Sequence, residues 1–315
     1  MKLSIVTINY NNEEGLERTL NSVLNQTYTE IEHIIVDGAS TDDSIRIIKE
    51  YVQRVNSEEG IVKESFDPKR DKNSGRAVVW SSEPDKGIYN AMNKGIRKAS
   101  GEYVYILNSG DAFAAADVVE KMMNILNDGM SRADALNEPH TLNDEMPILM
   151  GNIVHVYGDG KKLRERKRVA TSNQKPLPMD ASMLTFYRGT IPHDAAFVRR
   201  DLFEKYGYFD ETMKICADWK LYLDMIALGG VVPMYVDIDV VLFDMSGVSN
   251  TNNERRLAER RAYLEKVLPA AVLKDYDVYA EPISQYNRIR KYHLWGIVCF
   301  VERVLFKLNK WKILK

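Results

Sequence analysis

Cysteine is almost absent from this chain, which has only Cys216 and Cys299 among its 315 residues. Two cysteines so far apart make no disulfide framework of the kind that small secreted domains use, and they are too few for a zinc cluster. Such sparse use of cysteine is typical of a protein that folds in a reducing compartment. We therefore expect a cytoplasmic protein.

Long hydrophobic runs are also missing. No segment reaches the roughly 18 to 20 uninterrupted apolar residues that a membrane-spanning helix needs. The apolar start, from Lys2 to Tyr10, is too short for a signal peptide, and no small-residue cleavage site follows it. We therefore expect neither a spanning helix nor secretion.

Neither sign of charge dominates, since the formal net charge is -2. A nucleic-acid-binding protein usually carries a basic footprint, so we expect no nucleic-acid partner. Glycine-rich phosphate loops are missing as well: no G-x-G-x-x-G follows the first apolar run, and no G-x-x-x-x-G-K-[ST] occurs. Their absence disfavours dinucleotide oxidoreductases and P-loop enzymes.

Short apolar runs alternate with helical patterns through the first 130 residues. Strands are predicted at 3–8, 33–36, 77–80 and 103–107, and the helix after the last of these is expected to begin near Ala114. Later strands are predicted at 148–156, 195–198, 231–235 and 240–243, with a helix near 218–228. This order predicts an α/β fold with a mixed, mostly parallel sheet flanked by helices.

Three isolated carboxylates, Asp37, Asp85 and Asp111, each follow an apolar strand. In open α/β sheets ligands bind at the carboxyl ends of the strands, although Asp111 could instead cap the next helix. Carboxylates gathered at one edge repel each other unless a cation or hydrogen-bond donors compensate them. Mg²⁺ or Mn²⁺ with a substrate diphosphate would do so, and single carboxylates also accept hydrogen bonds from a base or a ribose.

Several motifs then resemble one family. They are Thr7-Ile8-Asn9-Tyr10-Asn11, Ser22-Val23-Leu24 with Gln26, Asp37-Gly38-Ala39-Ser40-Thr41-Asp42, Ser82 to Tyr89 with Ala91 to Gly95, Gly101 to Asp111, and His193 to Asp218. Together they resemble family 2 glycosyltransferases of the GT-A (Rossmann-like) fold, and among these the bacterial polysaccharide-assembly enzymes of the colanic-acid type.

The resemblance implies a role for each matching residue. Asp37 in its loop with Ser40 would bind the base, and Thr7 and Asn9 would wall the pocket. Asp85 and Lys86 would lie beside the ribose and base. The remaining nucleotide-sugar contacts would be Asn93, Asn108 and His193. Asn93 would be structural or lie near the sugar, and His193 would either donate a hydrogen bond to the diphosphate or be structural.

Asp111 would hold the divalent cation, Mn²⁺ or Mg²⁺. The usual Asp-x-Asp-Asp motif reads Asn108-Ser109-Gly110-Asp111 here, so the metal would rest on Asp111, waters and the phosphates. Cys216-Ala217-Asp218-Trp219 resembles the segment that carries the catalytic base. Asp218 is the candidate for that role, which is compatible with its capping a helix.

From Gln285 onward the sequence predicts an apolar helix face flanked by lysines and arginines, with Trp295 and Trp311 near its ends. Such a helix suits a membrane surface, and it also suits docking on the domain or in a homodimer. The basic run Lys161 to Arg168 is either a solvated hairpin or a contact for an anionic lipid-linked acceptor.

We therefore expect a glycosyltransferase domain over 1–250, with a nucleotide-binding half at 1–111 and an acceptor half at 148–250, and a basic helical extension over 251–315. It would be an inverting enzyme that moves a sugar from a nucleotide donor, a UDP-sugar, to a glycan or polyprenyl-linked acceptor at the cytoplasmic membrane face. The alternatives are a sugar-phosphate nucleotidyltransferase and a non-catalytic nucleotide-sugar-binding protein.

Overall fold

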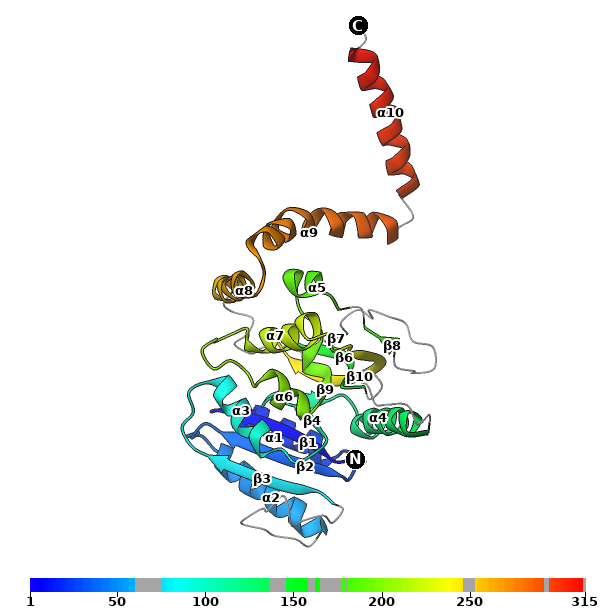
Figure 1. Cartoon of the computed structure of the whole chain (residues 1–315). Coiled ribbons are helices and arrows are strands. Elements are labelled where there is room, and N and C mark those ends of the chain that lie inside the picture. The colour runs from blue at the N-terminus through cyan, green and yellow to red at the C-terminus, as the bar shows by residue number, and fades with distance from the viewer. Residues whose placement is uncertain are drawn as a thin grey trace. The chain divides into compact units, whose positions relative to one another are not determined.

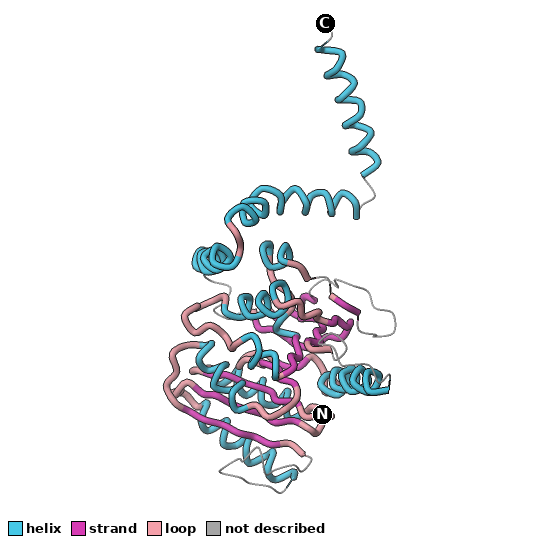
Figure 2. Tube along the Cα trace, viewed as in Figure 1, coloured by secondary structure: helices cyan, strands magenta, loops and turns pink. Residues whose placement is uncertain are grey.

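The computed structural model describes residues 1–59, 75–135, 146–157, 162–164, 177–179, 181–245, 253–291 and 295–313. Figure 1 labels its elements and Figure 2 colours them by type. The strands are β1 (Leu3–Asn9), β2 (Ile31–Asp37), β3 (Ala77–Ser82), β4 (Tyr103–Ile106), β5 (Ala112–Phe113), β6 (Ile148–Val156), β7 (Lys162–Arg164), β8 (Leu177–Pro178), β9 (Ala196–Arg199) and β10 (Met234–Asp244). The helices of the first part are α1 (Glu13–Leu24), α2 (Ser44–Glu59), α3 (Ile88–Lys98), α4 (Val118–Ala135), α5 (Met183–Arg188), α6 (Asp201–Tyr206) and α7 (Ala217–Tyr222). The later helices are α8 (Asn253–Val267), α9 (Ala270–Lys291) and α10 (Trp295–Ile313), and η2 (His193–Ala195) and η3 (Leu223–Leu228) are a 3₁₀ and a π-helical segment.

The strands form one mixed sheet in the order β3-β2-β1-β4-β9-β6-β10-β5, with β7 beside β6 and β8 beside β10. The four strands from β3 to β4 are parallel, β9 is antiparallel to both of its neighbours, and β6 runs parallel to β10. The predicted α/β class with a mixed sheet is confirmed. Because β1, β2, β3 and β4 are parallel, their carboxyl ends lie at one edge of the sheet.

Two apolar clusters cover the sheet. One joins α1, α2 and β2 through buried residues such as Leu20, Ile35 and Ile48. The other gathers residues of β4, β6, β9 and β10 under α4, where Met122, Tyr105 and Phe197 are buried. Burying apolar surface stabilises a fold by about 25 cal/mol per Å². These two clusters therefore stabilise the sheet and, with it, the edge at which the strands end.

Three predicted elements differ from the structure. The chain from Ala112 to Phe113 forms β5, which pairs with β10, so the helix predicted near Ala114 begins at Val118. The two predicted late strands form the single strand β10, whose register against β6 shifts between Tyr235 and Val241. The helix predicted at 218–228 is α7 followed by the wider turns of η3. Each difference arises from tertiary pairing or packing that sequence periodicity does not record.

Contacts divide the chain into two compact units, Met1–Arg260 and Arg261–Lys315. The domain boundary predicted at residue 250 falls among residues 246–252, which lie outside the described residues. Most of the basic run Lys161 to Arg168 also lies outside them, and only β7 is described there. No helix in the described ranges combines the length and hydropathy needed to cross a membrane.

Candidate active site

The carboxylate of Asp37 is fully buried at the end of β2. Its Oδ1 accepts hydrogen bonds from Asn9 Nδ2 at 2.9 Å and Ser40 Oγ at 2.6 Å, and its Oδ2 accepts from Ser40 N at 2.9 Å and Ser82 Oγ at 2.7 Å. Burial by itself would raise the pKa of Asp37, but these donors together hold it below its ordinary value. Asp37 is thus an ionised anchor that orients Asn9 and Ser40.

Asn9 has a buried Oδ1 with no hydrogen-bond partner, although its Nδ2 is paired with Asp37. An unpaired buried acceptor is unfavourable in a finished fold, so this atom is available for a donor brought by a ligand. Thr7, the next residue of β1 on the same face, instead pairs its Oγ1 with Nε2 of buried His33 at 2.9 Å. Asn9 Oδ1 is thus unpaired at the edge of the sheet, whereas the Thr7 hydroxyl is already hydrogen-bonded to His33 inside the protein.

Asp85 and Lys86 lie in the turn between β3 and α3. Asp85 Oδ1 accepts the backbone N–H of Gly87 at 2.8 Å, and a Cβ on Gly38 would come within 2.7 Å of Asp85 Oδ2. The same Cβ would lie 3.2 Å from the ring of Tyr10, a side chain that is 66% exposed. Asp37, Asp85 and the exposed Tyr10 ring therefore surround Gly38, while Lys86 projects into solvent.

Asn93 lies on α3, away from these residues, and is 1% exposed. Its Nδ2 donates to the Phe209 carbonyl and to Glu211 Oε1, both at 2.8 Å, and its Oδ1 accepts Phe209 N at 3.0 Å. Asn90, one turn earlier, also donates to Glu211 at 2.8 Å. These bonds join α3 to the loop before α7, so the structure gives Asn93 a structural part.

Asp111 is buried at the turn after β4, and its Oδ1 accepts Asp244 N at 2.9 Å. Burial raises the pKa of Asp111 to about 8; the carboxylates of Asp194 and Asp244 raise it as well, whereas the Asp244 N–H and Arg18 lower it. Arg18 itself pairs with Asp244 at 2.6 Å. Asp111 is thus a carboxylate in need of positive charge.

Asn108, three residues earlier, has a buried Oδ1 without a hydrogen-bond partner. Gly110 between them has φ +109°, a conformation that L side chains rarely adopt, so the turn itself disfavours a third side-chain ligand there. Among the described residues, no three His, Cys, Asp or Glu side chains come together to hold a metal. The oxygens of Asp111 and Asn108 nevertheless suit Mg²⁺ or Mn²⁺, which needs only one or two protein ligands when phosphates supply the rest.

His193 and Asp218 form an ion pair in the lining of one pocket, with Nε2 and Oδ2 3.0 Å apart. His193 Nδ1 lies 3.1 Å from the Ile191 carbonyl, which can only accept, so both ring nitrogens carry protons when Asp218 is ionised. Burial by itself would lower the pKa of His193, but the charges of Asp194 and Asp218 raise it to about 10. The pair is therefore an imidazolium and a carboxylate at neutral pH.

Asp218 lies in the first turn of α7, and its Oδ1 accepts Trp219 N at 2.6 Å. The hydroxyl of Tyr89 lies 3.4 Å from the same Oδ1 and donates to the Ile215 carbonyl at 2.7 Å. Burial would raise the pKa of Asp218, but His193 and the Trp219 N–H hold it below its ordinary value. Asp218 therefore stays ionised well into the acidic range.

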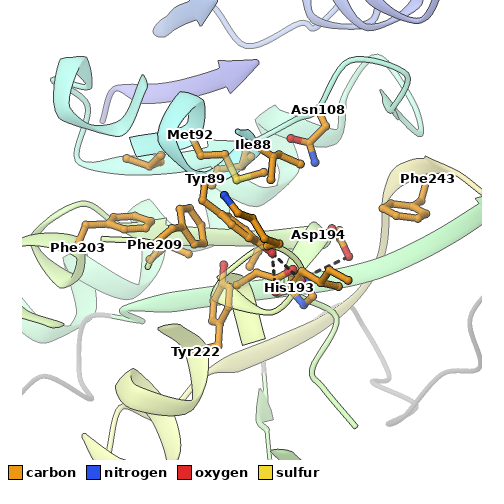
Figure 3. Close-up of a pocket in the computed structure, with 17 residues that line it drawn as sticks. Ile88, Tyr89, Met92, Asn108, His193, Asp194, Phe203, Phe209, Tyr222 and Phe243 are labelled. Atoms are coloured by element: carbon orange, nitrogen blue, oxygen red, sulfur yellow. Dashed lines mark hydrogen bonds and ion pairs between the residues drawn. The ribbon is translucent and has the colours of Figure 1, made fainter. Parts of the chain in front are cut away.

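A cavity of about 310 Å³ contains this pair. Figure 3 shows Ile88, Tyr89 and Met92 of α3 on one side, and His193 and Tyr222 on the other. Of the eleven predicted site residues, Asn108, His193 and Asp218 line it. The structure thus brings the end of β4 and the start of α7 to one cavity, whereas Asp37, Asn9 and Ser40 form a separate cluster at the ends of β1 and β2.

Two residues near the site carry no motif in the sequence. Glu259 of α8 accepts backbone N–H groups from Lys214 at 2.9 Å, Ile215 at 3.0 Å and Cys216 at 3.1 Å, and so holds the segment that leads into Asp218. Arg260 donates to the Gly189 carbonyl at 3.0 Å and lies over the ring of Trp219. Both fall in a charge-rich helix, and only the tertiary contacts reveal their part.

Comparison with known proteins identifies the class. The model of the family described as Glycosyl transferase family 2 matches residues 4–135. An uncharacterized glycosyltransferase of Mycobacterium tuberculosis is 30% identical over 223 residues, covering 70% of this chain and 67% of the relative. A PGL/p-HBAD biosynthesis glycosyltransferase of Mycobacterium bovis is 25% identical over 258 residues and covers 82% of each chain.

Solved structures agree in fold. Staphylococcus aureus TarS 1-349 in complex with UDP-GlcNAc has a TM-score of 0.52 at 17% identity, with 78% of this chain and 58% of that chain covered. GalNAc-T7 with UDP, GalNAc and Mn²⁺ has a TM-score of 0.58 at 16% identity, over 93% of this chain and 54% of that one. This chain therefore spans little more than half the length of these solved chains.

The mixed sheet and these neighbours show a fold of the GT-A type. The chain belongs to glycosyl transferase family 2, and it is accordingly a transferase.

Proposed function

We propose that this chain is an inverting glycosyltransferase that moves a sugar from a nucleotide-sugar donor, a UDP-sugar, to a glycan or lipid-linked acceptor. The observation that carries the proposal is the ionised Asp218 in the same cavity as Asn108, the first residue of the Asn108-to-Asp111 turn. The TarS structure in complex with UDP-GlcNAc and the mycobacterial relative named for PGL/p-HBAD biosynthesis are consistent with such a donor and acceptor.

The nucleotide would bind at the ends of β1, β2 and β3. Asn9 Oδ1 offers an unpaired acceptor to a base N–H, and Asp37 fixes the orientation of that amide. Ser40 would complete the loop, and Asp85 and Lys86 would lie beside the ribose and base. The buried positions of Thr7 and Asn93 favour a supporting role for both residues.

A divalent cation, Mn²⁺ or Mg²⁺, would be held by Asp111 and Asn108 with the donor diphosphate, and would neutralise the charge on the departing nucleotide. The buried carboxylate with a raised pKa and the unpaired amide oxygen support this assignment. His193 would contribute a second positive charge at the cavity.

Transfer requires a base for the proton of the acceptor hydroxyl. Asp218 would take that proton while the hydroxyl oxygen attacks the anomeric carbon from the face opposite the departing diphosphate. His193 would orient Asp218 through the bond between Nε2 and Oδ2 and keep it ionised before attack.

Donor hydrolysis with and without Mn²⁺ tests this assignment. Asp218→Asn should lower the rate by about 10²- to 10⁴-fold, the usual contribution of a positioned base. Asp224→Asn is the matched control. Asp224 pairs with Lys220, which lies four residues before it, and it does not line the cavity. Unchanged hydrolysis in Asp218→Asn would reject Asp218 as the base. If the wild-type protein binds no nucleotide, the proposal of a nucleotide-sugar donor is wrong.

The second unit would bind the membrane surface that presents a polyprenyl-linked acceptor. Phe300 and Phe306 of α10 are each 67% exposed, and the sequence around them carries Arg303, Lys307 and Lys310. Apolar side chains beside basic ones are the chemistry that inserts into an anionic lipid surface. This location would place the enzyme on the cytoplasmic face.

A further inference from the structure

Polar side chains line part of the cavity beside Asp218: Asp194, Tyr89 and Tyr222 lie next to the His193–Asp218 pair, and Asn108 and Lys214 lie elsewhere in the lining. Away from these groups its wall is made by side chains that are almost fully buried: Met92, Val104, Val198, Phe203 and Phe209. These residues come from α3, β4, β9, α6 and the loop before α7, so five elements build one apolar wall. The proposed reaction uses Asp218 and leaves this wall without a purpose.

A sugar ring does not suit the apolar part of the cavity. Its hydroxyls would lose water there and meet Met92, Val104 or Phe209, which offer no hydrogen bond. An aromatic ring or a short alkyl chain would instead gain from the same contacts, because burial of apolar surface on both sides is favourable. The base and ribose have their own cluster at Asp37 and Asn9, and neither residue lines this cavity.

We propose that the acceptor carries an aryl or short alkyl group next to its attacking hydroxyl, and that this cavity binds that group. The proposal rests on the proposed function, because it takes Asp218 as the base. The hydroxyl oxygen forms a bond to the anomeric carbon of the donor. The bond from that carbon to the diphosphate oxygen breaks with its electron pair on the nucleotide, and the hydroxyl proton passes to Asp218.

Phenyl β-D-glucoside and methyl β-D-glucoside are suitable probes, since they differ only in the aglycone. In the full-length protein with methyl-¹³C methionine, the Met92 methyl signal should shift on addition of the phenyl glycoside, because an aromatic ring displaces nearby resonances. Met122 of α4 is buried in the core and does not line the cavity, so its signal should not move. Binding of the phenyl glycoside should be at least about tenfold tighter than that of the methyl glycoside.

A pair of variants locates the effect. Ile88 lines the cavity and is 47% exposed, and Leu228, also 47% exposed, lies on η3 outside it. Ile88→Asn should weaken binding of the phenyl glycoside several-fold, and Leu228→Asn should leave it unchanged. Both replacements are at exposed positions, so neither opens a cavity in the core.

Three outcomes would overturn the proposal. They are an unmoved Met92 signal, equal binding of the two glycosides, and displacement of the phenyl glycoside by UDP alone, which would assign the cavity to the donor. Donor hydrolysis by the same wild-type sample reports separately on the proposed function. Hydrolysis without any Met92 response would therefore reject the aryl or alkyl acceptor and leave the transferase reaction standing.

Discussion

Burial makes the ionised state of Asp111 unfavourable in the folded protein. Asp111 is 7% exposed, and the nearby Arg18 is already paired with Asp244. Its pKa is raised to about 8, above the ordinary value of an aspartate. The folded protein therefore binds a proton at Asp111 more tightly than the unfolded chain does, and stability falls as pH rises from about 4 to about 8.

Asp111→Asn should remove this loss of stability at high pH, because an amide does not ionise. Without divalent cations the variant should match the wild type near pH 4 and exceed its free energy of unfolding above about pH 8, by an amount on the order of 6 kcal/mol. Urea unfolding at both pH values in EDTA measures the difference. Asp117→Asn, at an exposed position just before α4 where Asp117 pairs with Lys121, serves as the control and should show no such trend. A variant no more stable than the wild type at high pH would contradict the assignment.

His193 has a separable electrostatic effect on Asp218. It faces Asp194, Asp218, the Ile191 carbonyl and the Tyr222 ring, and its positive charge helps to hold the pKa of Asp218 down. His193→Gln keeps a side-chain donor and removes the charge. The pKa of Asp218 should then rise, and the acidic limb of the kcat profile should move to higher pH.

Initial rates from acidic to neutral pH test this shift, and His155→Gln provides a control because His155 packs against Phe243 rather than Asp218. An acidic limb that stays in place in His193→Gln, with an equal loss at every pH, would show that Asp218 is not the group that titrates.

The residues of the site were predictable to different degrees. Asp37, Asp111 and Asp218 stand out because each follows a strand or opens a helix in a recognisable motif. The pairing of His193 with Asp218 was not predictable from spacing, since 25 residues and α6 separate them. The hydrogen bond between the Thr7 hydroxyl and His33 was not predictable either, because no sequence motif includes His33.

Among the elements, α8 has the least expected part. Its Glu259 accepts three consecutive backbone N–H groups just before α7, and these donors hold the pKa of Glu259 below its ordinary value although burial opposes them. The start of α7, and with it Asp218, is therefore fixed from outside the sheet.

Glu259→Ala should leave the three N–H groups without their acceptor. We expect a loss of about 2–3 kcal/mol in unfolding free energy, together with a lower kcat, because Asp218 lies two residues beyond Cys216. Glu265→Ala on the same helix removes an exposed pair with Arg261 and should change stability by less than about 0.5 kcal/mol. Urea unfolding measures both variants. An equal loss of unfolding free energy in the two would show that Glu259 does not stabilise the segment before α7.

The first four strands were predictable because each pairs in parallel with a neighbour and is bounded by a helical pattern. In the later half the strands predicted at 148–156 and 195–198 match β6 and β9, whereas the two predicted late strands form the single strand β10, whose register depends on partners distant in sequence. The pairing of β5 with β10 turns residues that resemble a helix start into a strand, since hydrogen bonds to Val241 and Leu242 compensate the local preference.

For the molecule as a whole, the exposed apolar side chains of α10 are a candidate contact surface. The structure describes Ile297 to Phe306 of this helix as mostly exposed. An exposed apolar surface of this kind marks an interaction site.

The double variant Phe300→Ser/Phe306→Ser should reduce binding to vesicles that contain anionic lipid by at least about tenfold, because two aromatic side chains no longer enter the lipid. Co-sedimentation with such vesicles measures it. Tyr279→Ser, which removes a 56% exposed aromatic from α9, should have little effect. Unchanged sedimentation of the double variant would favour a protein partner for α10.

The sequence by itself determined the α/β class, the parallel strands with carboxylates at their ends, and the family, because these depend on local periodicity and short motifs. Only the tertiary structure decided which of those residues meet. It brought Asp218 to His193, left the Asn9 and Asn108 oxygens unpaired, and supported α7 with Glu259. Contacts of this kind arise from the packing of distant segments, and neither spacing nor composition encodes the distances at which they act.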